Sequence, residues 1–272
     1  MDRGERRILN ALGLRRAFVP LAALLHYVGE LVWLLLDTLR WLAHPSSWRL
    51  QRMLEQMARI GWGSLMVVAT ISFTIGIAIS FQIAYQLRKL GLANPIYTAS
   101  FSALMVFREI GPVLTALIVA GRVGASITAE LGMMNITQQI DALRTLATPP
   151  VKYLVVPRFL ALMIGLPLLT LYANAIGVLG GYVVGTSQLG FGSTFYFKMA
   201  AALLGPRDLL SGLLKALVFA AIICTVSCYE GFCTEGGAAG VGRATTRSVV
   251  VSFLLIIAAD ALFTMIFYFA GP

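Results

Sequence analysis

Charge is scarce in this chain of 272 residues, because only 12% of them are Asp, Glu, Lys or Arg while 58% are hydrophobic. A soluble domain carries about a quarter of its residues as charges, so a large soluble domain is excluded. Histidine is rarer still, with two residues. The sequence also lacks the G-x-x-x-x-G-K-[ST] motif, so the chain has no loop of this kind to hold the phosphates of ATP.

The three cysteines do not follow a metal-binding pattern. Cys224, Cys228 and Cys233 are spaced i, i+4 and i+9 at the end of an apolar segment, with no nearby His or C-x-x-C pair. We therefore expect small buried thiols and no metal site. The net charge of +9 is spread among apolar segments and does not form one basic face, so no nucleic-acid partner is expected.

Long apolar runs are what the chain has in abundance. About 20 helical residues cross a bilayer, and five segments meet this length: Gly61–Leu87, Thr98–Val123, Tyr153–Val184, Leu210–Phe232 and Val249–Phe269. A sixth, Phe18–Leu42, is interrupted by charges, which is typical of a helix in the membrane interface with Trp33, Trp41 and Trp48 at headgroup depth. Spanning is the alternative for this segment.

These segments predict an all-α integral membrane protein with a cytoplasmic N-terminus and interfacial helix in residues 1–60 and five spans in residues 61–272. Within the third span, Gly177, Gly181 and Gly185 recur every four residues, which predicts close helix packing.

The distribution of Lys and Arg predicts the orientation of the spans. Residues 1–60 contain nine arginines, and the loops at 122–158 and 233–248 add further basic residues, whereas 88–97 and 186–209 contain few. Because cytoplasmic loops carry the excess of positive charge, we expect the N-terminus inside and the C-terminus outside.

Two adjacent charges, Arg108 and Glu109, interrupt the outer half of the second span. A lone charge at the bilayer centre costs roughly 2.5–3.5 kcal/mol even on the lenient insertion scale. In one interpretation each charge pairs with another helix and holds the bundle together. In the other, a cavity receives a lipid headgroup, with the guanidinium on the phosphate and the carboxylate near an amine.

After the second span, residues 126–147 have apolar positions at near-helical spacing and end before Pro149 and Pro150. This pattern predicts one short amphipathic helix on the cytoplasmic side. Such a helix rests on the membrane or docks in the groove of a partner protein.

Several motifs in consistent order resemble the MlaE family of ABC-transporter permeases, which belong to MCE-type lipid transport systems. They are REIGPVLTALIVAGRVGASITAELG from Arg108, QQIDAL from Gln138, VVPR at 155–158 and GRATTRSVV at 242–250. The resemblance implies a homodimeric permease in the bacterial inner membrane, with its C-terminus periplasmic and a part in outer-membrane lipid asymmetry. It also implies ABC ATPase subunits that use the ATP, an MCE-domain protein on the outward face, an accessory STAS-type subunit and phospholipid as cargo. No cofactor is expected in this chain.

The resemblance also assigns candidate site residues. It places Arg108, Glu109 and Lys215 at a lipid-binding cavity, although the long stem of Lys215 also suits snorkelling to the interface. Polar residues in the first span share a face and are expected to line the cavity wall, unless they pack internally: Gln82 and Tyr85, with Phe81 beside them.

In the same way, 126–147 is expected to be the coupling helix in the ATPase cleft, with Thr128, Glu130, Gln138, Asp141 and Arg144 as its coupling residues. The family commonly has Glu where this chain has Gln138, so a charge-pair role there is in doubt.

The alternative functions are a lipid-modifying membrane enzyme and a non-transporting membrane scaffold. A lipid-modifying membrane enzyme needs a positioned acid, base or nucleophile, and no such constellation is present, so the chain is not expected to be an enzyme. A non-transporting scaffold leaves the charges at Arg108 and Glu109 without a purpose.

Overall fold

The computed structural model describes residues 14–43, 50–91, 95–188 and 190–269, and within them every long element is a helix. Five helices are long and apolar enough to cross a membrane, which confirms the predicted all-α membrane fold. The first is α3 (Leu50–Lys89). The predicted basic segment before residue 14 and Trp48 lie outside the described residues.

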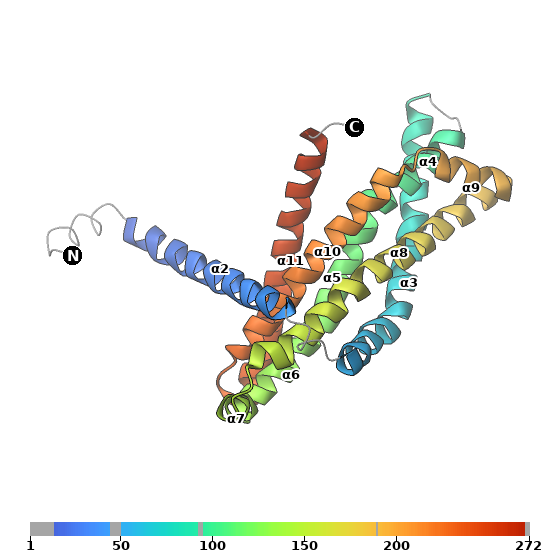
Figure 1. Cartoon of the computed structure of the whole chain (residues 1–272). Coiled ribbons are helices and arrows are strands. Elements are labelled where there is room, and N and C mark those ends of the chain that lie inside the picture. The colour runs from blue at the N-terminus through green and yellow to red at the C-terminus, as the bar shows by residue number, and fades with distance from the viewer. Residues whose placement is uncertain (1–13, 44–49, 92–94, 189, 270–272) are drawn as a thin grey trace.

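The second span is one continuous helix from Tyr97 to Ile136. Two π-helical segments interrupt its α geometry, so it consists of α4 (Pro95–Met105), η2 (Val106–Ile110), α5 (Gly111–Val119), η3 (Ala120–Gly124) and α6 (Ala125–Ile136). The third span is η4 (Val151–Val155) with α8 (Val156–Ser187), and the last two are α10 (Pro206–Phe232) and α11 (Gly237–Phe269). A short helix, α9 (Ser193–Ala202), lies beside α4 (Figure 1).

Helix α2 (Leu14–Leu42) stands to one side of the bundle in Figure 1 and contacts it through its second half. The hydroxyl of Tyr27 donates a 2.6 Å hydrogen bond to Glu230, and Arg247 lies 3.2 Å from the same carboxylate. Burial and this hydrogen bond raise the pKa of Tyr27 well above its usual value, so the phenol stays protonated as the donor. These contacts join α2 to the adjoining ends of α10 and α11.

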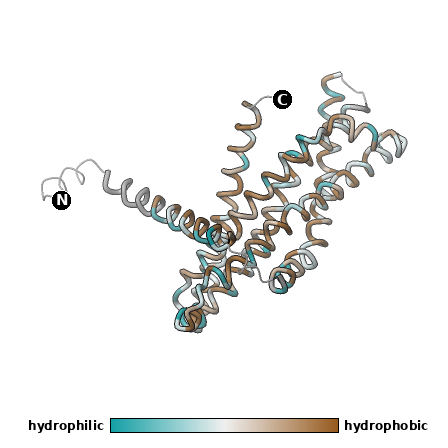
Figure 2. The backbone as a smooth tube through the Cα atoms, viewed as in Figure 1, coloured by the Kyte–Doolittle hydropathy of each residue, from teal (hydrophilic) through white to brown (hydrophobic). Residues whose placement is uncertain are grey.

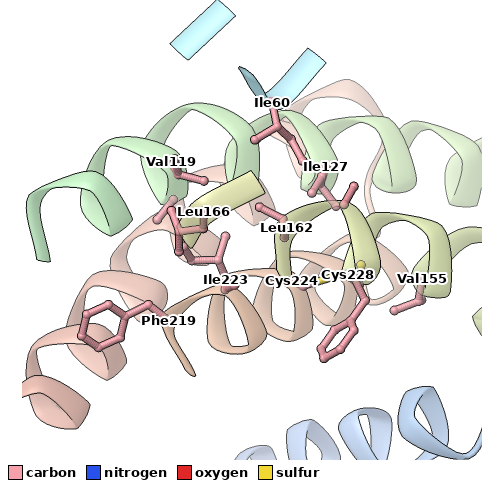
Figure 3. Packing of buried hydrophobic residues seen from close by; sticks show 14 of the residues in the cluster. Ile60, Val119, Ile127, Val155, Leu162, Leu166, Phe219, Ile223, Cys224 and Cys228 are labelled. Carbon is pink, nitrogen blue, oxygen red and sulfur yellow. The ribbon is translucent and has the colours of Figure 1, made fainter. Parts of the chain in front are cut away.

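The core lies where α3, α5, α6, α8 and α10 meet (Figure 3). Cys224 and Cys228 are buried in this cluster as free thiols, as predicted, whereas Cys233 is exposed. Hydrophobic residues run along the spans, and more hydrophilic ones gather towards α7 (Gln139–Thr145) at one end of the bundle (Figure 2).

The glycine-rich third span packs closely, as predicted. A Cβ atom at Gly76 of α3 would lie 2.0 Å from the carbonyl oxygen of Gly177. A larger residue at position 76 would therefore push the backbones of α3 and α8 apart. Gly181 and Gly185 instead face Tyr196 of α9. This single stripe therefore packs against two different helices.

The predicted single helix over 126–147 is wrong in its boundaries. Its first part, α6, continues the second span, and the chain turns at Gln138, whose φ of 59° is in the left-handed region. The short helix α7 follows, only 7 residues long. The glycine-rich segment before the last span also differs from the expected loop, because α11 already begins at Gly237.

Candidate functional site

The second span changes its winding at η2, the segment that contains Arg108 and Glu109. Pro112 has no N–H to donate, and its ring opposes the carbonyl four residues earlier, so a regular α-helix is strained here. The wider π turn accommodates the proline, with the N–H of Gly111 bonded to the carbonyl of Val106. Such π turns in α-helices are frequent at functional sites.

Two glycines let neighbouring spans approach this turn. A Cβ atom at Gly212 of α10 would lie 2.6 Å from the carbonyl oxygen of Phe107, and one at Gly111 would lie 1.8 Å from Oδ1 of Asn174 in α8. Because Lys215 is about one helical turn after Gly212, this close approach carries its side chain to η2.

Lys215 is the centre of a buried polar network. Its Nζ donates a 2.6 Å hydrogen bond to Oε2 of Glu109 and a 3.0 Å bond to the hydroxyl of Thr264. It also lies 2.8 Å from Oδ1 of Asp260, which is within ion-pair distance although the direction does not make a hydrogen bond. The Lys215 side chain is 1% exposed, so three spans converge on an ammonium withdrawn from solvent.

The network contains one more negative charge than positive charge, since Lys215 faces both Glu109 and Asp260. The carboxylates are 34% and 21% exposed, so they form the accessible side of the network. Breaking a buried pair of this kind leaves an uncompensated charge, which costs several kcal/mol. Snorkelling of Lys215 to the interface, the alternative considered above, does not occur in this structure.

Arg108 precedes Glu109 in η2 but has a different partner. Its Nε is 3.6 Å from Oδ1 of Asp208, and its side chain is 42% exposed. Asp208 also accepts a 2.9 Å hydrogen bond from the backbone N–H of Gly205, so it caps the start of α10. The guanidinium therefore keeps exposed surface, one residue before Glu109 in the chain.

The other predicted cavity residues do not join this cluster. Phe81, Gln82 and Tyr85 are exposed near the end of α3. Among the described residues, no hydrogen bond or ion pair links them to Glu109 or Lys215. A role for them as cavity wall stays a prediction.

Sequence reasoning missed Asp260, Thr264 and Asp208. Asp260 had a clear signal, because it is the only charged residue between Val249 and Phe269, and a lone intramembrane acid marks a functional site as Glu109 does. Thr264 had no such signal, since threonine is common in apolar helices. It is placed one turn after Asp260, on the same face.

A second charged cluster lies at the other end of the second span. Glu130 of α6 accepts a 2.8 Å bond from Nη2 of Arg158 at the start of α8, and Arg59 of α3 lies 3.5 Å away. The side chain of Arg158 is 7% exposed, so this cluster ties three helices together.

The remaining predicted coupling residues divide into two groups. Thr128 is fully buried, with its hydroxyl near the carbonyl of Ser227 and the hydroxyl of Ser248, so any coupling role for it acts through α10 and α11. Gln138 is exposed at the turn before α7. Asp141 and Arg144 form an exposed 3.0 Å pair on α7 itself.

Comparison with known proteins identifies the family. The family model described as Permease MlaE matches residues 53–266, which include all five spans apart from their outermost residues. The chain belongs to the MlaE permease family. Its relatives include a probable ABC transporter permease protein of Rickettsia prowazekii, 47% identical over 219 residues that cover 80% of this chain and 84% of that protein.

Two further relatives come from other organisms. The intermembrane phospholipid transport system permease protein MlaE of Haemophilus influenzae is 33% identical over 220 residues, with 80% of this chain and 84% of that protein covered. Protein TRIGALACTOSYLDIACYLGLYCEROL 1, chloroplastic, of Arabidopsis thaliana is 37% identical over 230 residues, which cover 85% of this chain and 65% of that protein. As a member of the MlaE family, the chain is a multi-span membrane component of a transporter.

Proposed function

We propose that this chain is the membrane-embedded subunit of an ATP-driven phospholipid transporter. The observation that carries the proposal is the buried ammonium of Lys215, held between Glu109 and Asp260 from three spans. Buried ions are expensive in a membrane and mark substrate paths. A scaffold needs no such network, and the name of the Haemophilus relative supports phospholipid as the cargo.

Arg108 and the neighbouring carboxylates match the two charges of a zwitterionic headgroup. The 42% exposed guanidinium of Arg108 has a distant partner at 3.6 Å, so its N–H groups remain for phosphate oxygens. Glu109 and Asp260 carry the surplus negative charge, which attracts a headgroup amine. In this proposal the network around Lys215, Glu109 and Asp260, here called the outer network, binds the headgroup. The acyl chains stay among apolar side chains.

The ATPase contact is proposed at α7, the end of the bundle opposite α4 and α9 (Figure 1). Leu146, directly after α7, is 74% exposed, and Met133 is 47% exposed. A short helix with exposed apolar residues on either side of it fits a groove on a partner. ATP binding and hydrolysis belong to that partner, because this sequence contains no P-loop motif.

The other subunits and the orientation are proposed from the resemblance to the MlaE family. We propose a homodimer in the bacterial inner membrane with α7 on the cytoplasmic side, an MCE-domain protein at the outer end and an accessory STAS-type subunit. Apolar side chains of α11 support a membrane-embedded partner, since Leu254, Ile257 and Leu262 are 56–63% exposed within one chain. The excess of arginine in residues 1–60 supports a cytoplasmic N-terminus.

The test is ATP-dependent transfer of a fluorescent phospholipid in proteoliposomes that contain the chain and its ATPase. We expect transfer to require ATP and to fall about tenfold in Arg108→Ala, because one charge-assisted phosphate contact stabilises binding by about 1.5–3 kcal/mol. The matched control is Arg207→Ala, which removes an exposed arginine near the same end of α10. Transfer without ATP, or equal transfer by the two variants, would contradict the proposal.

A further inference from the structure

A groove between α3 and the η3–α6 part of the second span holds two arginines that the outer network does not use. Its volume is about 670 Å³, and its polar lining includes Gln56, Arg59, Arg122 and Ser126. Two buried side chains, Ile60 and Ile127, form its apolar part. We propose that this groove is a binding site for the headgroup of an anionic phospholipid in the cytoplasmic leaflet.

The charge balance of the groove favours an anion. Glu130 is the acidic residue in its lining, and its 2.8 Å bond to the buried Arg158 already compensates that charge. Arg59 lies farther from the same carboxylate, at 3.5 Å, and is 70% exposed. Among the described residues, Arg122 has the neutral hydroxyl of Ser64 as its hydrogen-bond partner, at 2.9 Å. Two guanidinium groups therefore remain for phosphate oxygens.

The backbone of α3 is shaped to receive Arg122. A Cβ atom at Gly63 would lie 1.8 Å from Nη2 of Arg122, so only glycine leaves the guanidinium in its place against α3. At Gly61, by contrast, an added Cβ meets nothing within 4 Å. Gly63 thus positions Arg122 in the groove, and the two glycines provide a matched pair of substitutions.

The depth of the groove identifies a lipid as the occupant. Trp62 also lines it and is 86% exposed, which is unusual for so large an apolar side chain unless it lies at headgroup level. Glu130, which lines the groove, lies in α6, and α6 leads into α7 at one end of the bundle (Figure 1). The assignment of the groove to the cytoplasmic leaflet rests on the orientation given under the proposed function, but binding itself does not.

Trp62 provides the measurement. The chain is placed in nanodiscs containing phosphatidylcholine, and quenching of tryptophan fluorescence is compared for brominated phosphatidylglycerol and brominated phosphatidylcholine at equal mole fraction. The quenching that belongs to Trp62 is obtained by subtracting the quenching measured for the Trp62→Phe variant from that of the natural sequence. We expect an apparent affinity at least about fivefold higher for phosphatidylglycerol, because each of the two arginines near an anionic headgroup favours binding by about that factor.

The variants separate the headgroup site from general adhesion. Arg59→Gln with Arg122→Gln should abolish the preference, and Gly63→Ala should reduce it by displacing the Arg122 guanidinium, whereas Gly61→Ala should retain it. Inorganic phosphate in the buffer should leave it unchanged. Equal quenching by the two lipids, no quenching of Trp62 by either, a preference that survives loss of both arginines, or abolition by phosphate would each overturn the assignment.

Discussion

The two charged clusters of this protein have opposite compositions. The outer network places one cation, Lys215, between the carboxylates of Glu109 and Asp260. The inner cluster places one anion, Glu130, between the guanidinium groups of Arg158 and Arg59. The outer network therefore has a surplus of negative charge, and the inner cluster has a surplus of positive charge.

Burial separates the two clusters further. The central Lys215 is 1% exposed, whereas the central Glu130 is 39% exposed and its partner Arg59 is 70% exposed. Water screens Glu130 and Arg59, although not the buried Arg158, and it does not reach the middle of the outer network. The comparison indicates that the inner cluster fastens helix ends, while the outer network needs a reason beyond stability for its cost in the membrane.

The largest effect is expected from Lys215→Met, which leaves Glu109 and Asp260 without their shared cation. Removing one partner of a buried ion pair costs about 3–5 kcal/mol. The expected result is a marked fall in the thermal unfolding midpoint of the purified protein. Lys198→Met, which removes an exposed lysine from α9, should leave the midpoint unchanged, and similar midpoints for the two variants would contradict the account.

A smaller effect is expected from Glu130→Gln, since the amide keeps hydrogen-bonding oxygen for Arg158 but loses the charge. We expect a loss of about 1–3 kcal/mol in stability, because a hydrogen bond to a charged group is replaced by a neutral one at a partly exposed site. Denaturant titration measures it. A loss as large as that of Lys215→Met would remove the distinction between the clusters.

The smallest effect on stability is expected from Asp141→Asn with Arg144→Gln. Their 3.0 Å pair is exposed at both side chains, so its removal should cost about 0.5 kcal/mol or less. If α7 contacts the ATPase, the same double variant should nevertheless lower lipid-stimulated ATP hydrolysis by the assembled transporter. Normal hydrolysis and transfer in this variant would separate these two residues from coupling.

Much of the fold could be predicted from apolar length alone. Five spans and one helix outside them follow from segments long enough to cross a bilayer. The break at Gln138 could not be predicted, because the apolar periodicity of residues 126–147 continues across it and glutamine gives no signal for a positive φ. Residues 233–248 were expected to form a loop between two spans, yet the backbone is helical from Gly237.

The sequence pointed to candidate site residues but not to their partners in the structure. The cost of burying charge singled out Arg108 and Glu109, and family resemblance added Lys215. Their different environments depend on helix phase and on the close approach at Gly212, which brings together residues 106 positions apart in the chain. Asp260 was detectable by the same cost, and it changes the network from a simple pair into a surplus of acid.

The most direct test of the central claim combines Lys215→Met, Glu109→Gln and Asp260→Asn, so that no charge is left unpaired in the outer network. The account predicts that unfolding stability recovers relative to Lys215→Met alone, while ATP-dependent phospholipid transfer stays about tenfold or more below that of the natural sequence, because headgroup contacts worth about 1.5–3 kcal/mol are lost. Transfer at the natural rate by this neutral variant would show that the network only holds the helices together.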